Sequence, residues 1–208
     1  MHRVLRSLGL VVGLLLAGAS LVQAAEELKA AAPAMDPAKQ AAMEAMQQLG
    51  SPSEGHKALE PFVGSWTYTL EWRMAPDAPP ETMTGTAANS LILGGRFLKQ
   101  AIAGTTEGHP PFEGIGFTGY DNIRKEYTSV WIDNMGTGMM VGTGQFDVAT
   151  KTLTEQSDFS CPMTGEAHRK SRAVWKVVDA DHHVYESHMQ TPEGQEFKAM
   201  EIRYTRAQ

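Results

Sequence analysis

The sequence is poor in cysteine, in basic residues and in long apolar runs, and each shortage excludes a class of protein. Cys161 is the only cysteine among 208 residues. The chain therefore forms no internal disulfide and no four-cysteine zinc site. Lys and Arg number 18 against 24 Asp and Glu, which gives a net charge of −6 at pH 7. Because this charge repels phosphate groups, we expect no nucleic acid as a partner.

The longest apolar run lies at the start of the sequence. Residues Met1–Arg6 carry two arginines, the stretch Leu8–Ala19 is apolar, and small residues precede Ala25. This order predicts a signal peptide at 1–24 that is removed after Ala24. The apolar stretch is shorter than the roughly 20 residues that span a membrane. We therefore expect an exported protein, periplasmic or secreted, that has no stable membrane insertion once the signal is removed.

Residues 25–53 predict a flexible tether followed by an amphipathic helix. Asp36 is a favourable N-cap and Pro37 suits the first helical position, whereas Gly50 is typical of a helix end. The sequence thus predicts a helix over 38–49. Three apolar residues share one face of this helix and are expected to form a packing surface: Met43, Met46 and Leu49.

Beyond this helix the hydrophobic pattern changes to a period of two. In Trp66–Met74 the large apolar residues occupy every second position, which indicates a strand with one buried face. Nine breaks rich in Gly, Pro, Asn and Asp divide the rest of the chain, and no segment is a helix long enough to connect parallel strands. The ten predicted antiparallel segments are 66–74, 81–93, 96–105, 112–120, 126–133, 139–147, 152–159, 167–178, 182–190 and 196–206.

Ten short antiparallel strands form either a sandwich or a closed barrel. Closure leaves no unpaired edge. Eleven of the 17 glycines in residues 25–208 lie between Gly94 and Gly144. A strongly curved sheet needs such glycines. The pattern therefore favours a barrel, whose interior at this strand number is wide enough for a cavity.

Gly64-Ser65-Trp66 at the start of the first strand resembles the opening Gly-x-Trp of the calycin superfamily, which holds lipocalins and fatty-acid-binding proteins. Closure brings the start of the first strand beside the end of the last, and therefore Trp66 near Arg206. A guanidinium over an indole contributes about 0.5–2 kcal/mol. The resemblance implies that Trp66 and Arg206 close one end of the barrel.

A longer set of motifs is similar to a family of bacterial proteins of unknown function with calycin-like barrels. The resemblance spans about residues 54–206 and implies an all-β fold over 54–208: an antiparallel up-and-down calycin-like barrel of about ten strands, with a short N-terminal helical extension. It implies no activity. The motifs are 59–66, Gly94-Gly95-Arg96-Phe97-Leu98, Phe112-Glu113-Gly114, Gly119-Tyr120-Asp121, Trp131-Ile132-Asp133, Pro162-Met163-Thr164-Gly165 and 200–206.

Candidate metal ligands are few. His182 and His188 share one face of a predicted strand and His183 takes the other, so at most two of the three converge. Two imidazoles do not define a zinc site. Cys161 and nearby methionines offer soft ligands for copper, but a turn and core packing explain them better. We predict no cofactor. A haem-binding variant of the calycin barrel has an axial histidine, so a haem-binding or metal-binding barrel stays open as an alternative.

The sequence offers no recognisable catalytic constellation. Gly-x-Ser-x-Gly is absent, and Asp121, Asp133 and Asp158 near strand ends suit turn capping. We therefore predict no catalytic residues and lean away from an enzyme. A hydrolase-like enzyme and a ligand-free structural or interaction protein remain as alternatives.

What the sequence does supply is a set of aromatic rings with polar tips. Such rings are common in cavities that hold a small apolar or amphipathic molecule. We predict that the interior binds such a ligand, although the same rings would also fill a solid core. For the fifth strand either Tyr127 and Trp131 or Val130 and Ile132 face inward. The predicted ligand-binding residues are Tyr68, Trp72, Phe117, Tyr127, Trp131 and Tyr204.

Overall fold

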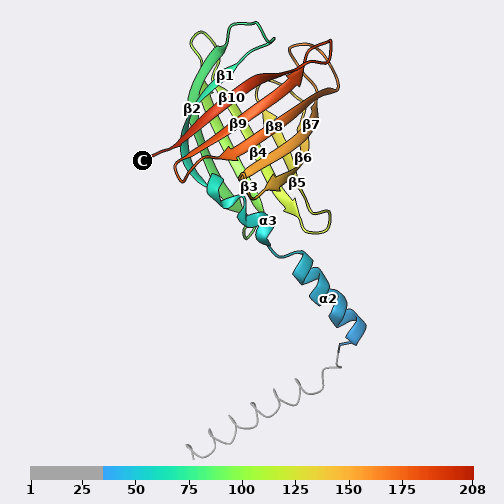
Figure 1. The fold of residues 1–208 in the computed structure, drawn as a ribbon. Coiled ribbons are helices and arrows are strands. Elements are labelled where there is room, and N and C mark those ends of the chain that lie inside the picture. Colours follow the sequence, from blue (N-terminus) through green and yellow to red (C-terminus); the bar gives the residue numbers. More distant parts are fainter. Residues whose placement is uncertain (1–34) are drawn as a thin grey trace, which may run out of the picture. The chain divides into compact units, whose positions relative to one another are not determined.

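The computed structural model describes residues 35–208 (Figure 1). The predicted signal peptide at 1–24 and most of the predicted tether lie outside the described residues. The chain divides after Gln48 into two compact units, the second of which comprises Leu49–Gln208. Within residues 35–208, no helix has the length and apolar character needed to cross a membrane.

Helix α2 (Pro37–Leu49) begins one residue before the predicted 38–49, with Pro37 as its first residue, and ends at the predicted Leu49. The Asp36 side chain accepts a hydrogen bond from the Ala38 amide at 2.9 Å, which satisfies one of the free amides at the helix start. No residue of α2 is buried. The predicted packing surface is therefore exposed, with Met43 at 48% and Met46 at 70%.

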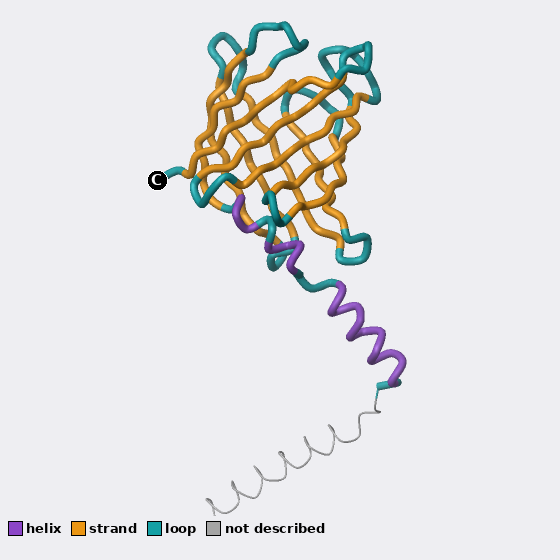
Figure 2. Tube along the Cα trace, viewed as in Figure 1, coloured by secondary structure: helices purple, strands orange, loops and turns teal. Residues whose placement is uncertain are grey.

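Ten antiparallel strands form a closed barrel, which confirms the predicted fold (Figure 2). Each strand pairs with its neighbours in sequence, and β1 pairs with β10 to close the sheet. Strand bounds differ from the prediction by at most two residues. The strands are β1 (Gly64–Trp72), β2 (Glu81–Ile92), β3 (Phe97–Thr105), β4 (Phe112–Asp121), β5 (Glu126–Asp133), β6 (Met140–Asp147), β7 (Thr152–Phe159), β8 (Arg169–Val177), β9 (His182–Gln190) and β10 (Glu196–Arg206).

Burial alternates along the strands because successive side chains point into and out of the barrel. In β1, Trp66, Tyr68 and Leu70 are buried and the threonines between them are exposed. The register of β1 with β10 sets Trp66 opposite Arg206 and Tyr68 opposite Tyr204. The inward face of the fifth strand is now defined, since Tyr127 is buried and Ile132 is exposed.

One end of the barrel is closed by the short segment before β1. It consists of helix α3 (Glu54–Lys57), which lies against that end in Figure 1, and the 3₁₀ helix η1 (Glu60–Phe62). Phe62 is 2% exposed, and its carbonyl accepts hydrogen bonds from Trp66 Nε1 at 3.0 Å and Asn89 Nδ2 at 2.9 Å. The opposite end carries the long loops after β1, β3, β5, β7 and β9.

Candidate functional site in the barrel interior

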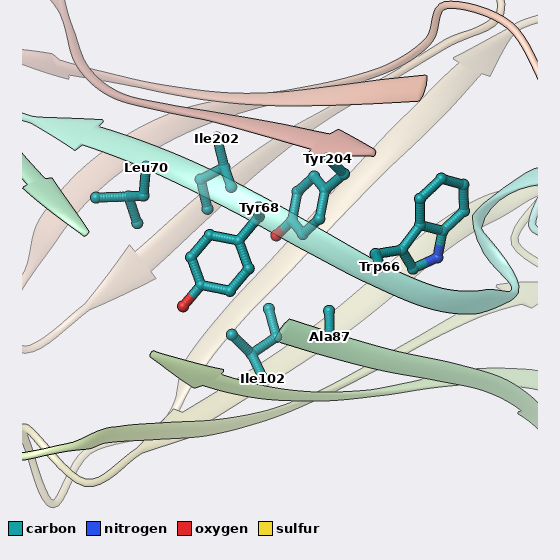
Figure 3. Close-up of a cluster of buried hydrophobic side chains, with 7 residues drawn as sticks. All are labelled: Trp66, Tyr68, Leu70, Ala87, Ile102, Ile202 and Tyr204. Atoms are coloured by element: carbon teal, nitrogen blue, oxygen red, sulfur yellow. The ribbon is translucent and has the colours of Figure 1, made fainter. Parts of the chain in front are cut away.

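The closed end is packed with rings. The aromatic rings of His183 and Tyr204 stack with their centroids 4.2 Å apart, and His183 meets Trp66 edge-on at 4.3 Å. Figure 3 shows Trp66 and Tyr68 on β1 with Tyr204 beside them. We call this group the floor cluster. It consists of Phe62, Trp66, Trp175, His183 and Tyr204.

Arg206 covers the floor cluster from outside. Its Cζ lies 4.1 Å from the centroid of the Trp66 ring. The guanidinium also donates to the carbonyl oxygens of Val63 and Ala180, at 3.0 Å and 2.9 Å. The two residues that the sequence assigns to barrel closure therefore lie in contact at the closed end.

His183 is a neutral packing residue in this arrangement. It is 1% exposed, and neither ring nitrogen has a hydrogen-bond partner among the described residues. Burial, together with the nearby Arg206 charge, lowers the pKa of His183 to about 3. Because the rings of the floor cluster surround it, an axial bond from His183 to a haem iron would require that cluster to open.

The remaining candidate metal ligands point elsewhere. His182 is exposed and contacts Asp179 at 2.8 Å, and His188 contacts Glu186 at 3.2 Å on the outer face of β9. Cys161 is 8% exposed, and its amide donates to Glu166 at the base of a turn. Within residues 35–208, no three His, Cys, Asp or Glu side chains are arranged to hold a metal ion.

Glycines let two large rings lie against the barrel wall. A Cβ on Gly104 would lie 2.3 Å from the Tyr68 hydroxyl, and one on Gly114 would lie 2.3 Å from the Trp131 ring. Tyr68 accordingly lies across β2 and β3, where its hydroxyl donates to the Ala103 carbonyl at 3.3 Å. The glycines predicted from sheet curvature thus also provide room for the rings of neighbouring strands.

The end opposite the floor cluster, which carries the longer loops, is lined by apolar side chains that are only partly buried. Trp131 is stacked with Phe112 at 6.5 Å, and its indole nitrogen donates to Asp133 at 2.8 Å. Trp72 pairs with Met200 at the ends of β1 and β10. We call this group the mouth ring. It consists of Trp72, Met83, Phe112, Trp131 and Met200, all packed against the central core.

Between the floor cluster and the mouth ring the wall is polar. Glu155 is 4% exposed and Gln100 is 3% exposed. Glu155 Oε1 and Gln100 Nε2 have no hydrogen-bond partner in the part of the chain that the structure describes. Buried polar atoms are normally paired. The polar lining consists of Gln100, Ser129, Glu155, Ser157, Ser171 and Ser187, of which Ser157 and Ser171 share a hydrogen bond at 2.7 Å.

The electrostatics of this lining follow from its burial. Burial raises the pKa of Glu155, and hydrogen bonds from the side chains of Ser129 and Trp175 offset part of the rise. Burial also raises the pKa of Tyr185, and the neighbouring Glu155 adds to the rise. Glycine at 144 permits the close approach of β7, because a Cβ there would lie 2.3 Å from the Thr154 carbonyl oxygen and 2.7 Å from Glu155 Cγ.

Sequence reasoning missed Glu155 and Gln100. The available signal was parity: Glu155 occupies the same strand face as Leu153, and Gln100 the same face as Leu98 and Ile102. A charged or amide side chain on an otherwise apolar face is a candidate buried polar group. Asp121, Asp133 and Asp158 lie near strand ends, whereas Glu155 and Gln100 lie in the middle of strands, where the sequence predicts core packing.

The structure brings four of the six predicted ligand-binding residues to the central interior: Tyr68, Trp72, Trp131 and Tyr204. Tyr127 also faces inward, but it packs at the closed end. Its hydroxyl donates to the Gly55 carbonyl at 2.7 Å, and its ring lies 4.9 Å from that of Tyr120.

The prediction that Phe117 lines the interior is wrong, because its side chain faces outward and is 37% exposed. Gly116 and Thr118, its neighbours in β4, are buried and define the inward face of the strand. Hydrophobicity favoured Phe117 for the interior, but the glycine face of β4 is the one that receives the Trp131 ring. Phe117 lies beside Val130, its partner in the neighbouring strand β5.

A shallow depression on the outside of the barrel differs from this interior site. It has a volume of about 420 Å³ and lies over β1, β2 and β10. Thr67, Thr69 and Thr84 line it, and they are outward-facing, exposed residues. Threonine is common on the solvent face of strands. The interior, which holds the buried unpartnered polar atoms, is therefore the better candidate site.

Two solved structures share this architecture. Rv2717c from M. tuberculosis has a TM-score of 0.57 and 15% sequence identity, covering 76% of this chain and 100% of its own. The S-type phycobiliprotein lyase CPES from Guillardia theta has a TM-score of 0.52 and 12% identity, covering 78% and 97%. At these identities the likeness concerns the fold alone. No match was found among the curated proteins.

A family model described as "Protein of unknown function (DUF1579)" matches residues 51–206. The matched range begins just before α3 and ends with Arg206, so it comprises the closing segment and all ten strands. It leaves out α2. The chain therefore belongs to the DUF1579 family.

Proposed function

We propose that this protein is an exported binding protein that holds a small amphipathic molecule inside its barrel. The observation that carries the proposal is the pair of buried, unpartnered polar atoms, Glu155 Oε1 and Gln100 Nε2, in the polar lining between the floor cluster and the mouth ring. An unpaired buried polar group costs about 1–3 kcal/mol. A ligand that supplies the missing hydrogen bonds recovers that cost.

In this proposal the ligand enters at the end opposite the floor cluster, through the mouth ring. The mouth ring is apolar and partly exposed, and two of its five side chains, Met83 and Met200, are methionines. Methionine adapts its shape to different apolar partners. The mouth ring would therefore contact the apolar part of the molecule and the polar lining its polar part. The floor cluster, which is closely packed, sets the depth of the site.

A hydrophobic fluorescent probe, 8-anilinonaphthalene-1-sulfonate, tests whether the interior accepts a ligand. We expect probe binding to the native protein with quenching of tryptophan emission. Trp72→Ala should weaken binding several-fold through lost apolar contact. Phe117→Ala is the control, because it removes an aromatic ring from the outer face and should leave binding unchanged.

Two outcomes would reject this function. The first is that the native protein binds neither the probe nor any lipid-like molecule. The second is that Phe117→Ala reduces binding as much as Trp72→Ala does, which would place the probe on the outer surface.

Export rests on the leader pattern of residues 1–24. Mass spectrometry of the intact protein, recovered from the periplasm or the medium of an expressing bacterium, tests it. We expect a mature chain that begins at Ala25. A chain that keeps residues 1–24 and stays in the cytoplasm would contradict export and leave the ligand-binding proposal standing.

A further inference from the structure

Glu155 lacks a cationic partner. None of the ion pairs among the described residues involves Glu155. The two arginines on the inward faces of the strands are both engaged elsewhere: Arg169 with Glu166 at 3.0 Å, and Arg206 with Trp66 and backbone carbonyls. A buried carboxylate is costly unless it is paired. The barrel interior therefore carries an acidic group with no cation of its own.

The surroundings of Glu155 suit an organic cation. Trp175 donates toward the carboxylate, and Tyr185 is close enough to be influenced by its charge. The rings of Trp175 and Tyr185 meet edge-on with their centroids 4.7 Å apart. Aromatic faces attract ammonium groups. A carboxylate beside two aromatic rings thus combines the two features that recognise an amine.

From this arrangement we infer that the ligand is a hydrophobic amine, whose protonated nitrogen pairs with Glu155 while its apolar part lies toward the mouth ring. The inference rests on the proposed binding function and names the chemical class of the ligand. It disfavours fatty acids, because a ligand carboxylate supplies no opposite charge to Glu155 and is repelled by its ionised form.

The unbound protein tolerates Glu155 through two features already described. Burial raises the pKa of its carboxyl, which favours the neutral form when no cation is present. Ser129 donates to the same carboxylate from β5. An ammonium group that enters the site shifts the balance toward the carboxylate form, because the opposite charge compensates for the lost water.

Three ligands with the same chain separate this inference from general apolar binding: decylamine, decanol and decanoic acid. Their binding to the full chain is measured by calorimetry at neutral pH. We expect decylamine to bind at least tenfold more tightly than the other two, equivalent to about 1.4 kcal/mol. Glu155→Gln should remove that preference while leaving decanol affinity within about threefold, which is about 0.7 kcal/mol.

Glu113→Gln is the matched control, because Glu113 is an exposed residue on the outer face of β4. It should leave all three affinities unchanged. Equal affinity for the amine, the alcohol and the acid would overturn the amine inference, as would an unchanged preference in Glu155→Gln, and in both cases the binding function would stand. If none of the three ligands nor the fluorescent probe binds, the proposed function itself fails.

Discussion

Two of the buried titratable side chains in the interior lie in contrasting surroundings: His183 in the floor cluster and Glu155 in the polar lining. Both face inward, and both have polar atoms without hydrogen-bond partners among the described residues. His183 is enclosed by rings at centroid distances as short as 4.2 Å. Glu155 lies beside hydroxyl and indole donors that interact with its carboxylate.

The comparison shows that burial alone does not identify a functional group. Close packing of rings holds His183 neutral, so it acts as a flat aromatic side chain that stacks on Tyr204. Glu155 instead has donors on some sides and no cation. The rings of the floor cluster enclose His183 although its nitrogens have no partner, whereas Glu155 lies among polar side chains where a ligand would supply the missing cation.

The largest effect should come from removing the floor cluster's largest ring. Trp66→Ala deletes a side chain that is 1% exposed and should lower the free energy of unfolding by about 3–5 kcal/mol. Trp131→Ala, which removes a partly exposed ring of the mouth ring, should cost about 1–3 kcal/mol. Urea unfolding monitored by circular dichroism measures both. Equal costs would show that the two ends are packed alike.

The second prediction concerns pH and distinguishes the two titratable groups. The pKa of His183 falls from 6.5 in the unfolded chain to about 3 in the folded one, so the unfolded chain binds the additional proton between these values. Stability should therefore fall as pH decreases from about 6.5 toward 3, and each pKa unit of difference corresponds to about 1.4 kcal/mol. His183→Phe, which keeps a ring among Phe62, Trp66, Trp175, Tyr204 and Arg206, should reduce this acid loss.

Glu155 should act in the opposite direction. Its raised pKa means that the folded chain holds the proton more tightly than the unfolded chain does. The stabilisation that Glu155 contributes to the folded chain is fully present below its ordinary pKa of 4.5 and is lost as the pH rises through its pKa in the folded chain. Glu155→Gln should flatten that loss. Unfolding by urea at a series of pH values from about 4 to 8 measures both variants. Identical pH profiles for the native protein and both variants would contradict this account.

The smallest effect tests the space that glycine provides for the Trp131 ring. Gly114→Ala would place a Cβ 2.3 Å from that ring, which must then move toward the interior. We expect a loss of about 1–3 kcal/mol in stability and weaker probe binding. Gly136→Ala is the control, since its Cβ would lie 3.7 Å from Pro162, an ordinary contact, and should change stability by less than about 0.5 kcal/mol. If both variants are neutral, the ring does not depend on Gly114.

Much of the fold was predictable because its signals are local. Period-two alternation and turn residues located all ten strands, and the bounds of β5, β7, β9 and β10 agree with the prediction. Parity also separated His183 from His182 and His188. The position of Phe117 was not predictable from its hydrophobicity, because the inward face of β4 carries glycines that make space for a ring from β5.

The sequence by itself determined the all-β class, the closure of β1 on β10 and the family, because these depend on alternation, turn chemistry and motifs along the chain. Only the tertiary structure decided which polar groups are buried without partners. Whether Glu155 meets a cation depends on side chains from β5, β8 and β9, which lie around it only once these strands have paired and the sheet has curved. The hydrogen-bond and charge partners of a buried group depend on this three-dimensional arrangement. The candidate site could therefore be identified from the fold and not from the sequence alone.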